Sequence, residues 1–240
     1  MELQISNLVK QYGRNVVLDV PSLSIEKGTL LGLVGNNGAG KTTLFRLILD
    51  LLEADSGCVL SKETDVRQTE TWKKYTAAFI DTRFLIEFLT PEEYFDFVGH
   101  THGLSKEDVQ ERLRPFHRFM HQEILGGRKY IHSFSAGNKQ KIGIIAAMMV
   151  HPEVLILDEP FNFLDPSSQI EIRDLIGEMN RSKGITVLIS SHNLTHTIEI
   201  STRLILLEKG IVKKDLINTP ASVTELNEYF IRQATGDIVS

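Results

Sequence analysis

A glycine-rich segment, GNNGAGKTT, carries the strongest chemical signal in this 240-residue chain. Glycines at positions 35, 38 and 40 let the backbone curl tightly, so that its N–H groups can converge on phosphate oxygens. Lys41 can reach the β- and γ-phosphates of a nucleotide, and the Thr42 hydroxyl can ligate Mg²⁺. The spacing G-x-x-x-x-G-K-T is the P-loop pattern. The sequence therefore predicts a phosphate site built from Gly35, Asn36, Asn37, Gly38, Ala39, Gly40, Lys41, Thr42 and Thr43.

Two carboxylates follow an apolar run further along the chain. Residues 154–157 (VLIL) are typical of a parallel strand covered on both faces, and Asp158-Glu159-Pro160 ends that run. The carboxyl ends of such strands are where ligands bind in open α/β sheets. Asp158 can therefore hold Mg²⁺, and Glu159 can polarise a water molecule for attack on a γ-phosphate. His192 follows a second apolar run, residues 185–189, and could hydrogen-bond the same phosphate.

Three weaker signals each leave two interpretations open. Ser135 opens a predicted helix with small residues after it, which indicates either a second phosphate site or ordinary helix capping. Tyr12 lies at a predicted turn and could stack on a base or cover the core. His117 and His121 have i, i+4 spacing on a predicted helix, where a solvated face is favoured over a shared metal.

The surrounding elements are predicted to place these residues around an α/β core. Residues 30–34 form a buried strand before the glycine-rich segment, and Leu44, Leu47, Ile48 and Leu51 form the apolar stripe of the helix after it. Residues 1–30 alternate as antiparallel strands. Residues 203–214 form a closing hairpin. The sequence thus favours a mixed sheet with helices on both faces.

Helix-start signals divide the rest of the chain. From about Arg83 to Val150 the pattern is helical, with capping boxes beginning at Thr90 and at Ser105. Asp165-Pro166 is an N-cap followed by the first helical residue. A last amphipathic helix is expected over residues 222–233, with Ser222 and Glu225 as its capping box.

Composition excludes several classes of protein. Hydrophobic residues make up 42% of the chain, which is enough for a sizeable core. The net charge of −5 gives no overall basic field for nucleic acid. A single cysteine excludes an internal disulfide and fits a reducing cytosol. The N-terminus lacks the pattern of a secretion signal, and the apolar run over 142–150 is far shorter than a membrane-spanning helix.

Taken together, the motifs at 35–42, 134–140, 154–159, 162–166 and 192 resemble the nucleotide-binding domain of ABC-type ATPases. The resemblance covers nearly the whole chain. It implies a P-loop NTPase core with an antiparallel β subdomain over residues 1–82 and 151–220. It also implies a helical subdomain over 83–150 and a C-terminal helix and tail over 221–240, all within one nucleotide-binding domain with ATP and Mg²⁺ as cofactors.

The same resemblance implies a role for each motif. Ser135-Ala136-Gly137 looks like the centre of the family's LSGGQ signature, with Phe134 and Ala136 in place of its Leu and Gly. Tyr12 resembles the adenine-stacking aromatic. Asp158 and Glu159 resemble the Walker B Asp and the catalytic Glu. Asp165 resembles the D-loop Asp, and His192 resembles the switch histidine.

One position departs from the family pattern. The stretch TAAFIDTRFLIEFLT, residues 76–90, matches the family's Q-loop region without gaps and puts Asp81 where a glutamine is expected. Aspartate can still ligate Mg²⁺ or order water, but it adds negative charge and lacks the amide donor. The departure therefore bears on the geometry that couples ATP hydrolysis to a partner more than on ATP binding itself.

In function, the resemblance implies the ATPase subunit of an ABC transporter, of the ABC-2 or exporter kind. Such a subunit is cytoplasmic and peripheral on the membrane, and drives a separate membrane-spanning permease. It works as a head-to-tail dimer, with itself or with a sister ATPase, and binds no nucleic acid. Two alternatives are a soluble ABC ATPase acting on nucleic acid or the ribosome, and a regulatory module with little turnover.

Overall fold

The computed structural model describes residues 1–192 and 194–235. Over these residues one continuous sheet has the strand order β5-β4-β1-β2-β10-β9-β3-β8-β7-β6. Strands β6, β7, β8, β3 and β9 pair in parallel, whereas β1, β2, β4 and β5 pair antiparallel. The strands are β1 (Leu3–Tyr12), β2 (Asn15–Ile25), β3 (Leu30–Val34), β4 (Ser56–Ser61), β5 (Thr64–Asp65), β6 (Thr76–Phe79), β7 (Val154–Leu157), β8 (Thr186–Ser191), β9 (Arg203–Glu208) and β10 (Ile211–Ile217).

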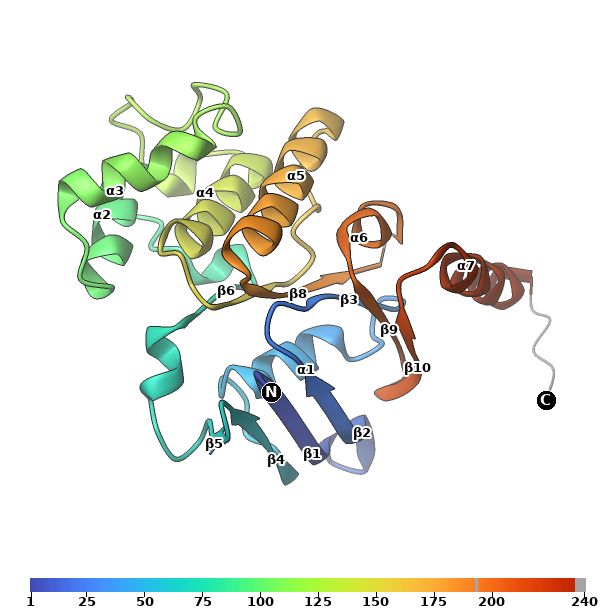
Figure 1. The fold of residues 1–240 in the computed structure, drawn as a ribbon. Helices are drawn as coiled ribbons and strands as arrows, with labels where there is room; N and C mark the ends of the chain where they lie inside the picture. The colour runs from blue at the N-terminus through green and yellow to red at the C-terminus, as the bar shows by residue number, and fades with distance from the viewer. Residues whose placement is uncertain (193, 236–240) are drawn as a thin grey trace.

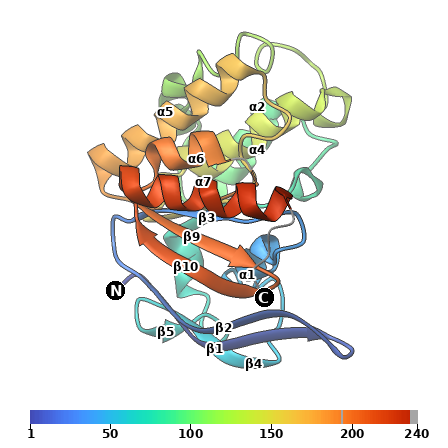
Figure 2. The same ribbon diagram turned by 90° about the vertical axis from the view of Figure 1, so that its right-hand side faces the viewer.

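Helices cover both faces of the parallel strands (Figure 1). On one face lie α2 to α5, and on the other α1 lies between the parallel strands and the antiparallel ones (Figure 2). The last helix, α7, packs against β9 and β10, which lie inside the sheet between β2 and β3. The helices are α1 (Lys41–Ile48), α2 (Pro91–Thr101), α3 (Lys106–Leu113), α4 (Ala136–Met149), α5 (Pro166–Lys183), α6 (Leu194–Ile200) and α7 (Pro220–Thr235).

The position of strand β7 between two hydrophobic cores explains why its sequence is a continuous apolar run. Leu155 and Leu157 pack into the core under α2 to α5, while Val154 and Ile156 pack into the core that contains α1. Successive side chains of a strand point to opposite faces, so a strand between two helical layers needs apolar residues throughout. The predicted mixed α/β sheet with helices on both faces is confirmed.

The predicted helix starts are confirmed where a cap is encoded locally. Thr90 and Ser105 each accept a hydrogen bond from the backbone N–H three residues later, and each begins a complete capping box. Asp165 caps α5 through the Ser168 N–H, with Pro166 as the first helical residue. Over the described residues, the structure has no helix long and apolar enough to cross a membrane.

The helix after the P-loop ends earlier than predicted, and Leu51 is not part of its buried stripe. Helix α1 stops at Ile48, and Asp50 adopts a positive φ of 51°. The N–H groups of Leu51 and Asp50 then bond to the carbonyls of Arg46 and Leu47, which is a Schellman motif. The reversal leaves Leu51 53% exposed.

The prediction that His117 and His121 share a helix face is wrong. Pro115 has no N–H and lies two residues after the end of α3 at Leu113, so the helix gives way to a short 3-10 turn over Arg114–Phe116. His121 then has a positive φ of 50°, and its Nε2 lies 3.1 Å from a carboxylate oxygen of Glu171.

The C-terminal helix also begins differently from the prediction. Helix α7 starts at Pro220, and Thr219 precedes it as the cap. The Ser222 N–H donates to the Thr219 hydroxyl, and the Thr219 N–H donates to the Ser222 hydroxyl, so these two residues form the reciprocal pair. Glu225 instead pairs with Lys214 on β10. Residues 236–240 of the predicted C-terminal segment lie outside the described residues.

Candidate functional site

The P-loop, residues 35–42, leaves the centre of the sheet at the carboxyl end of β3. All five residues of β3 are buried between β8 and β9, which fixes the point where the loop begins. A Cβ at Gly35 would lie 2.3 Å from the Leu207 carbonyl oxygen, so only glycine allows the backbone to pass there. The positive end of α1 then faces the concave side of the loop, where it favours an anion.

Lys41 is the buried cation of this loop, with only 6% of its surface exposed. Its Nζ donates to the carbonyl oxygens of Gly35, at 2.6 Å, and Asn36, at 3.3 Å. It also lies 3.3 Å from Oε1 of Glu159. Because the ammonium already spans the loop and the carboxylate, it can exchange these contacts for phosphate oxygens with little movement.

Asp158, at the carboxyl end of β7, is held between two hydroxyl groups. The Thr42 hydroxyl donates to its Oδ2, and the Ser190 hydroxyl donates to its Oδ1. Burial raises the pKa of Asp158 above its usual range, although the two hydroxyl hydrogen bonds act in the opposite direction. The oxygens of Thr42 and Asp158 thus stand side by side, as the hard ligands of Mg²⁺ should.

Glu159 is fixed by backbone as well as by side-chain contacts. It has a positive φ of 49°, a conformation that costs a non-glycine residue about 1 kcal/mol or more. Its N–H donates to the Ser190 hydroxyl at 2.8 Å, and its carbonyl accepts from Gln140 Nε2 at 3.1 Å. His192 contacts its Oε2 through Nδ1 at 2.8 Å and through its own backbone N–H at 3.2 Å. The five predicted residues Lys41, Thr42, Asp158, Glu159 and His192 therefore form one connected cluster.

The signature segment, residues 134–140, lines a different cavity from the P-loop. Ser135 caps α4, and its hydroxyl accepts from the Asn138 N–H at 3.2 Å. Ser135, Ala136, Gly137 and Asp165 line a cavity of about 420 Å³, while Gly35 to Ala39 line another cavity next to α7. Within one chain, the two predicted phosphate-binding segments are therefore not part of one cavity.

Two predicted residues do not line the cavity beside the P-loop. Tyr12 ends β1, is 57% exposed and lies across the hairpin turn from Asn15. Asp81 caps a short 3-10 turn, and its Oδ2 accepts from the Arg83 guanidinium at 2.7 Å. The Arg83 side chain holds the pKa of Asp81 below its usual range. The carboxylate at the predicted Q-loop position is thus paired with a cation of its own loop.

Sequence reasoning missed Ser190 and Gln140. Ser190 is fully buried and bonds to both Asp158 and Glu159, and Gln140 reaches Glu159 from α4. Both positions could have been suspected, because Ser190 precedes His192 at the same strand end and Gln140 closes the signature segment. Neither pattern alone says which atom it contacts.

Comparison with known proteins decides the family. The model of the ABC transporter family matches residues 18–162, which is more than half of the chain. The chain belongs to the ABC transporter family. This ABC ATPase is 35% identical to the bacitracin transport ATP-binding protein BcrA of Enterococcus faecalis, over 87% of the chain and 67% of the relative. It is 31% identical to the sulfate/thiosulfate import ATP-binding protein CysA of Pectobacterium atrosepticum, over 93% of the chain and 68% of that relative.

A solved ATP-binding subunit of an ABC transporter has the same fold. It superposes with a TM-score of 0.81 at 29% identity, covering 100% of this chain and 95% of the other. The ABC ATPase described here is therefore an ATP-binding subunit of an ABC transporter that hydrolyses ATP. Its relatives include an import protein, so family membership leaves the direction of transport open.

Removing the buried charge of Asp158 should stabilise the ABC ATPase in the absence of nucleotide and Mg²⁺. Its raised folded-state pKa means that folding stability falls as pH rises from about 4 through the folded pKa. Asp158→Asn keeps an acceptor and removes the charge, so we expect a Tm about 2–4 °C higher at pH 7.5. The gain should shrink as pH is lowered towards 4. Calorimetry against Asp19→Asn, which removes an exposed carboxylate, tests this, and a lower Tm for Asp158→Asn would contradict it.

Proposed function

We propose that this ABC ATPase powers an exporter, pairing head to tail with a second nucleotide-binding domain around two MgATP. The observation that carries the head-to-tail pairing is the separation of the P-loop from the signature segment in one chain. A nucleotide that is contacted by a P-loop on one side and by a signature segment on the other therefore needs the signature segment of another subunit. A second copy of this chain supplies it, and the symmetric arrangement completes two sites at once.

Each residue of the cluster has a chemical role in this proposal. Lys41 binds the β- and γ-phosphates, and the backbone N–H groups of the P-loop bind the other phosphate oxygens. Glu159 accepts a proton from the attacking water, and His192 orients that carboxylate and contacts the γ-phosphate. Tyr12, exposed at the turn between β1 and β2, stacks on the adenine.

Mg²⁺ fits the side chains that the cluster provides. The Thr42 hydroxyl and the Asp158 carboxylate are adjacent, and both are the oxygen donors that Mg²⁺ prefers. When bound, the ion neutralises the charge that develops on the phosphates during transfer. Asp81 would join these ligands only after leaving Arg83, so it is the weakest of the three predicted metal contacts.

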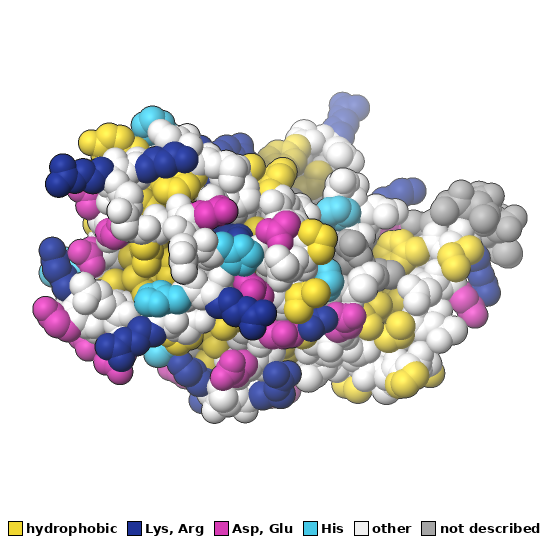
Figure 3. Space-filling view, turned by 90° about the horizontal axis from the view of Figure 1, so that it is seen from above, with side chains coloured by type: hydrophobic (Ala, Val, Ile, Leu, Met, Phe, Trp, Pro, Cys, Tyr) yellow, Lys and Arg dark blue, Asp and Glu magenta, His cyan; other side chains and the backbone are white. Residues whose placement is uncertain are grey.

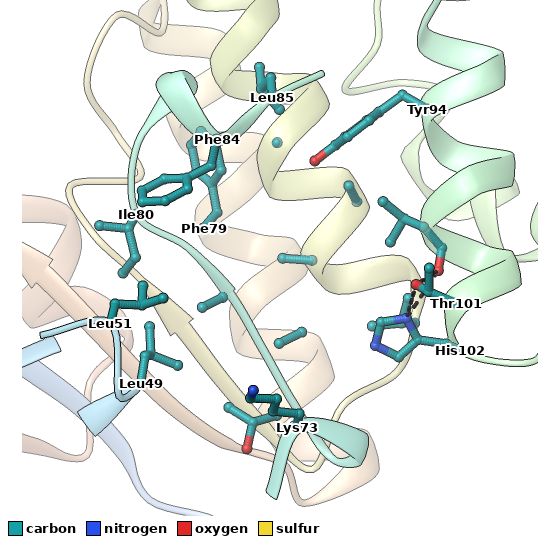
Figure 4. A pocket seen from close by; sticks show the side chains of 18 of the residues that line it. Leu49, Leu51, Lys73, Phe79, Ile80, Phe84, Leu85, Tyr94, Thr101 and His102 are labelled. Atoms are coloured by element: carbon teal, nitrogen blue, oxygen red, sulfur yellow. Dashed lines mark hydrogen bonds between the residues drawn. The ribbon is translucent and has the colours of Figure 1, made fainter. Parts of the chain in front are cut away.

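The docking site of the membrane-spanning subunit is a groove beside Asp81. A cavity of about 430 Å³ lies between β6 and helices α2 and α4, and its wall is mostly apolar. Figure 4 shows Leu51, Ile80 and Phe84 on one side and Tyr94 on the other, with Lys73 and His102 at the far end. Phe84 is 57% exposed, which leaves apolar surface for a docked helix to cover.

Phe84→Asp should release the membrane-spanning subunit without weakening ATP binding. Loss of one buried phenylalanine contact at an interface weakens association by about tenfold or more. Ile231→Asp is the matched control, because Ile231 is 61% exposed on α7, outside the residues that line the groove. Co-purification from detergent with a tagged chain measures the effect. Equal recovery of the membrane subunit by both variants would contradict this docking site.

The proposal also places the chain on the cytoplasmic face of the membrane, without a nucleic-acid partner. The face over α2 to α5 carries basic and acidic side chains interspersed, with no broad basic field (Figure 3). Affinity capture from gently solubilised native membranes tests the proposal. A stoichiometric multi-span protein is expected. Co-capture of a substrate-binding protein would indicate import instead, and recovery only with ribosomes or nucleic acid would contradict the transporter role.

A further inference from the structure

Gln169, in the first turns of α5, holds the short segment of chain that follows Glu159. Its Nε2 donates to the backbone carbonyl oxygens of Phe161, at 3.0 Å, and Leu164, at 3.2 Å. These two hydrogen bonds use both hydrogens of the amide, so Oε1 of Gln169 is left as an acceptor. The Gln169 side chain therefore ties residues 161–164 to the start of α5 and can accept one more hydrogen bond.

His196, on α6, is the group that donates to this oxygen. Its Nε2 lies 3.1 Å from Oε1 of Gln169. Because the amide oxygen can only accept, the imidazole must carry a proton on Nε2. The imidazole ring also packs against the Phe161 ring, with 5.3 Å between the ring centroids. The two hydrogen-bonded side chains, called here the Gln169–His196 bridge, thus connect α6 to residues 161–164.

The second ring nitrogen of His196 shows that packing alone does not account for a histidine at this position. Nδ1 is buried and has no hydrogen-bond partner among the residues that the structure describes. The Glu199 carboxylate lies 3.6 Å from it and is held by Nη1 of Arg173 at 2.6 Å. An apolar side chain would fill the space beside Phe161 without burying an unpaired nitrogen. The hydrogen bond to Gln169 is therefore what the histidine contributes.

The bridge joins the same two stretches of chain that meet inside the nucleotide cluster. Glu159 lies two residues before Phe161, and His192 lies four residues before His196. Glu159 and His192 contact each other directly, with 2.8 Å between Oε2 and Nδ1. Helices α5 and α6, which carry the two halves of the bridge, lie side by side (Figure 1). The contact between Glu159 and His192 is therefore supported from outside the cluster by a second connection.

We propose that Gln169 and His196 are positioning residues for ATP hydrolysis, and that their bridge fixes the Glu159 carboxylate relative to His192. The inference rests on the roles proposed above for Glu159 and His192. Neither Gln169 nor His196 lines the cavity beside the P-loop or the cavity of the signature segment, so they act through other residues. Without the bridge, α6 can shift against residues 159–164, and Glu159 is held less firmly where it accepts the proton. A misplacement of about 1 Å can lower a rate by about 100-fold.

Steady-state ATPase kinetics of the full chain with MgATP test the proposal. We expect His196→Leu and Gln169→Leu each to lower kcat by about 10-fold or more, while the KM for ATP stays within about twofold of the wild-type value. His196→Gln keeps an N–H donor and should restore most of the lost kcat. Protein concentrations at which specific activity no longer rises exclude weaker self-association as the cause. His100→Leu, which replaces an exposed histidine on α2, should leave kcat unchanged.

A double-mutant cycle separates the bridge from a general loss of packing. Each single leucine variant removes the same hydrogen bond between Nε2 of His196 and Oε1 of Gln169. The double variant should therefore be hardly slower than Gln169→Leu alone, because residues in one hydrogen-bond network are not additive. Additive losses of kcat would show two independent effects and would overturn the proposal. So would a loss in His196→Leu that His196→Gln does not restore.

The outcomes separate this inference from the proposed function. If Glu159→Gln hydrolyses ATP as fast as the wild type, the proposed role of Glu159 fails and the inference fails with it. If Glu159→Gln loses turnover while His196→Leu and Gln169→Leu keep the wild-type kcat, only the inference is overturned. A non-additive loss of kcat with an unchanged KM, restored by His196→Gln, supports it.

Discussion

Replacing Glu159 by glutamine should lower steady-state ATP turnover by about 10²- to 10⁴-fold, the usual contribution of a general base. The amide has nearly the shape of the carboxylate but cannot accept the proton of the attacking water. ATP binding should be retained or strengthened. Lys41 lies 3.3 Å from the Glu159 carboxylate, so loss of that charge leaves the ammonium freer to bind phosphate.

Glu153→Gln is the matched control for this experiment. Glu153 immediately precedes the other end of β7 and pairs with Lys62 at 2.8 Å. Its replacement removes one carboxylate from the same strand region, far along the strand from the nucleotide cluster. Phosphate-release assays should show near-normal turnover for this control. Turnover of Glu159→Gln within a few-fold of the wild type would remove Glu159 from the role of base.

Lys41→Ala should weaken ATP binding by about 100-fold or more and abolish measurable turnover. The ammonium is buried, and charge-assisted hydrogen bonds to phosphate contribute about 1.5–3 kcal/mol each. The alanine variant also leaves Glu159 without its cation in the empty site. Calorimetric titration with ATP measures the loss directly.

Lys106→Ala controls for the loss of one positive charge. Lys106 lies on the surface of α3 and pairs with Asp96 at 3.6 Å. We expect its ATP affinity to match that of the wild type. An ATP affinity of Lys41→Ala equal to that of Lys106→Ala would mean that the phosphates bind elsewhere.

Most residues of the nucleotide cluster could be predicted from sequence, because they lie at or near the ends of buried strands. The strands β3, β7 and β8 are buried, β3 and β7 are apolar throughout and β8 is apolar at its centre, and the residues of the cluster follow the ends of these strands. Parallel strands bring those ends to one edge of the sheet. Lys41, Asp158 and His192 therefore meet although they lie far apart in the chain.

Contacts that depend on tertiary packing were less predictable. Ser190 lies inside a strand whose sequence gives no sign that its hydroxyl bonds to both Asp158 and Glu159. Asp81 and Arg83 are close in sequence, but a loop allows many alternative pairs of this kind, so the sequence does not single out this one. The close approach of the Phe163 carbonyl to Gly137 is likewise encoded by no periodic pattern.

Errors in the helical region have a common physical origin. Apolar spacing predicts where a helix fits, but a reversal at Asp50 or a proline at position 115 ends it. Leu51 keeps the spacing of the α1 stripe and nevertheless lies beyond the helix. Its side chain lines the apolar groove instead.

Head-to-tail pairing, the central claim, is tested most directly by cross-linking two differently altered chains. One chain carries Asn37→Cys in the P-loop and the other Asn138→Cys in the signature segment, both with Glu159→Gln and with the single native cysteine replaced by Cys58→Ser. With a short bifunctional reagent, we predict a cross-link in the mixture only, and only with ATP and Mg²⁺. A cross-link within either variant alone, or none in the mixture, would contradict the account.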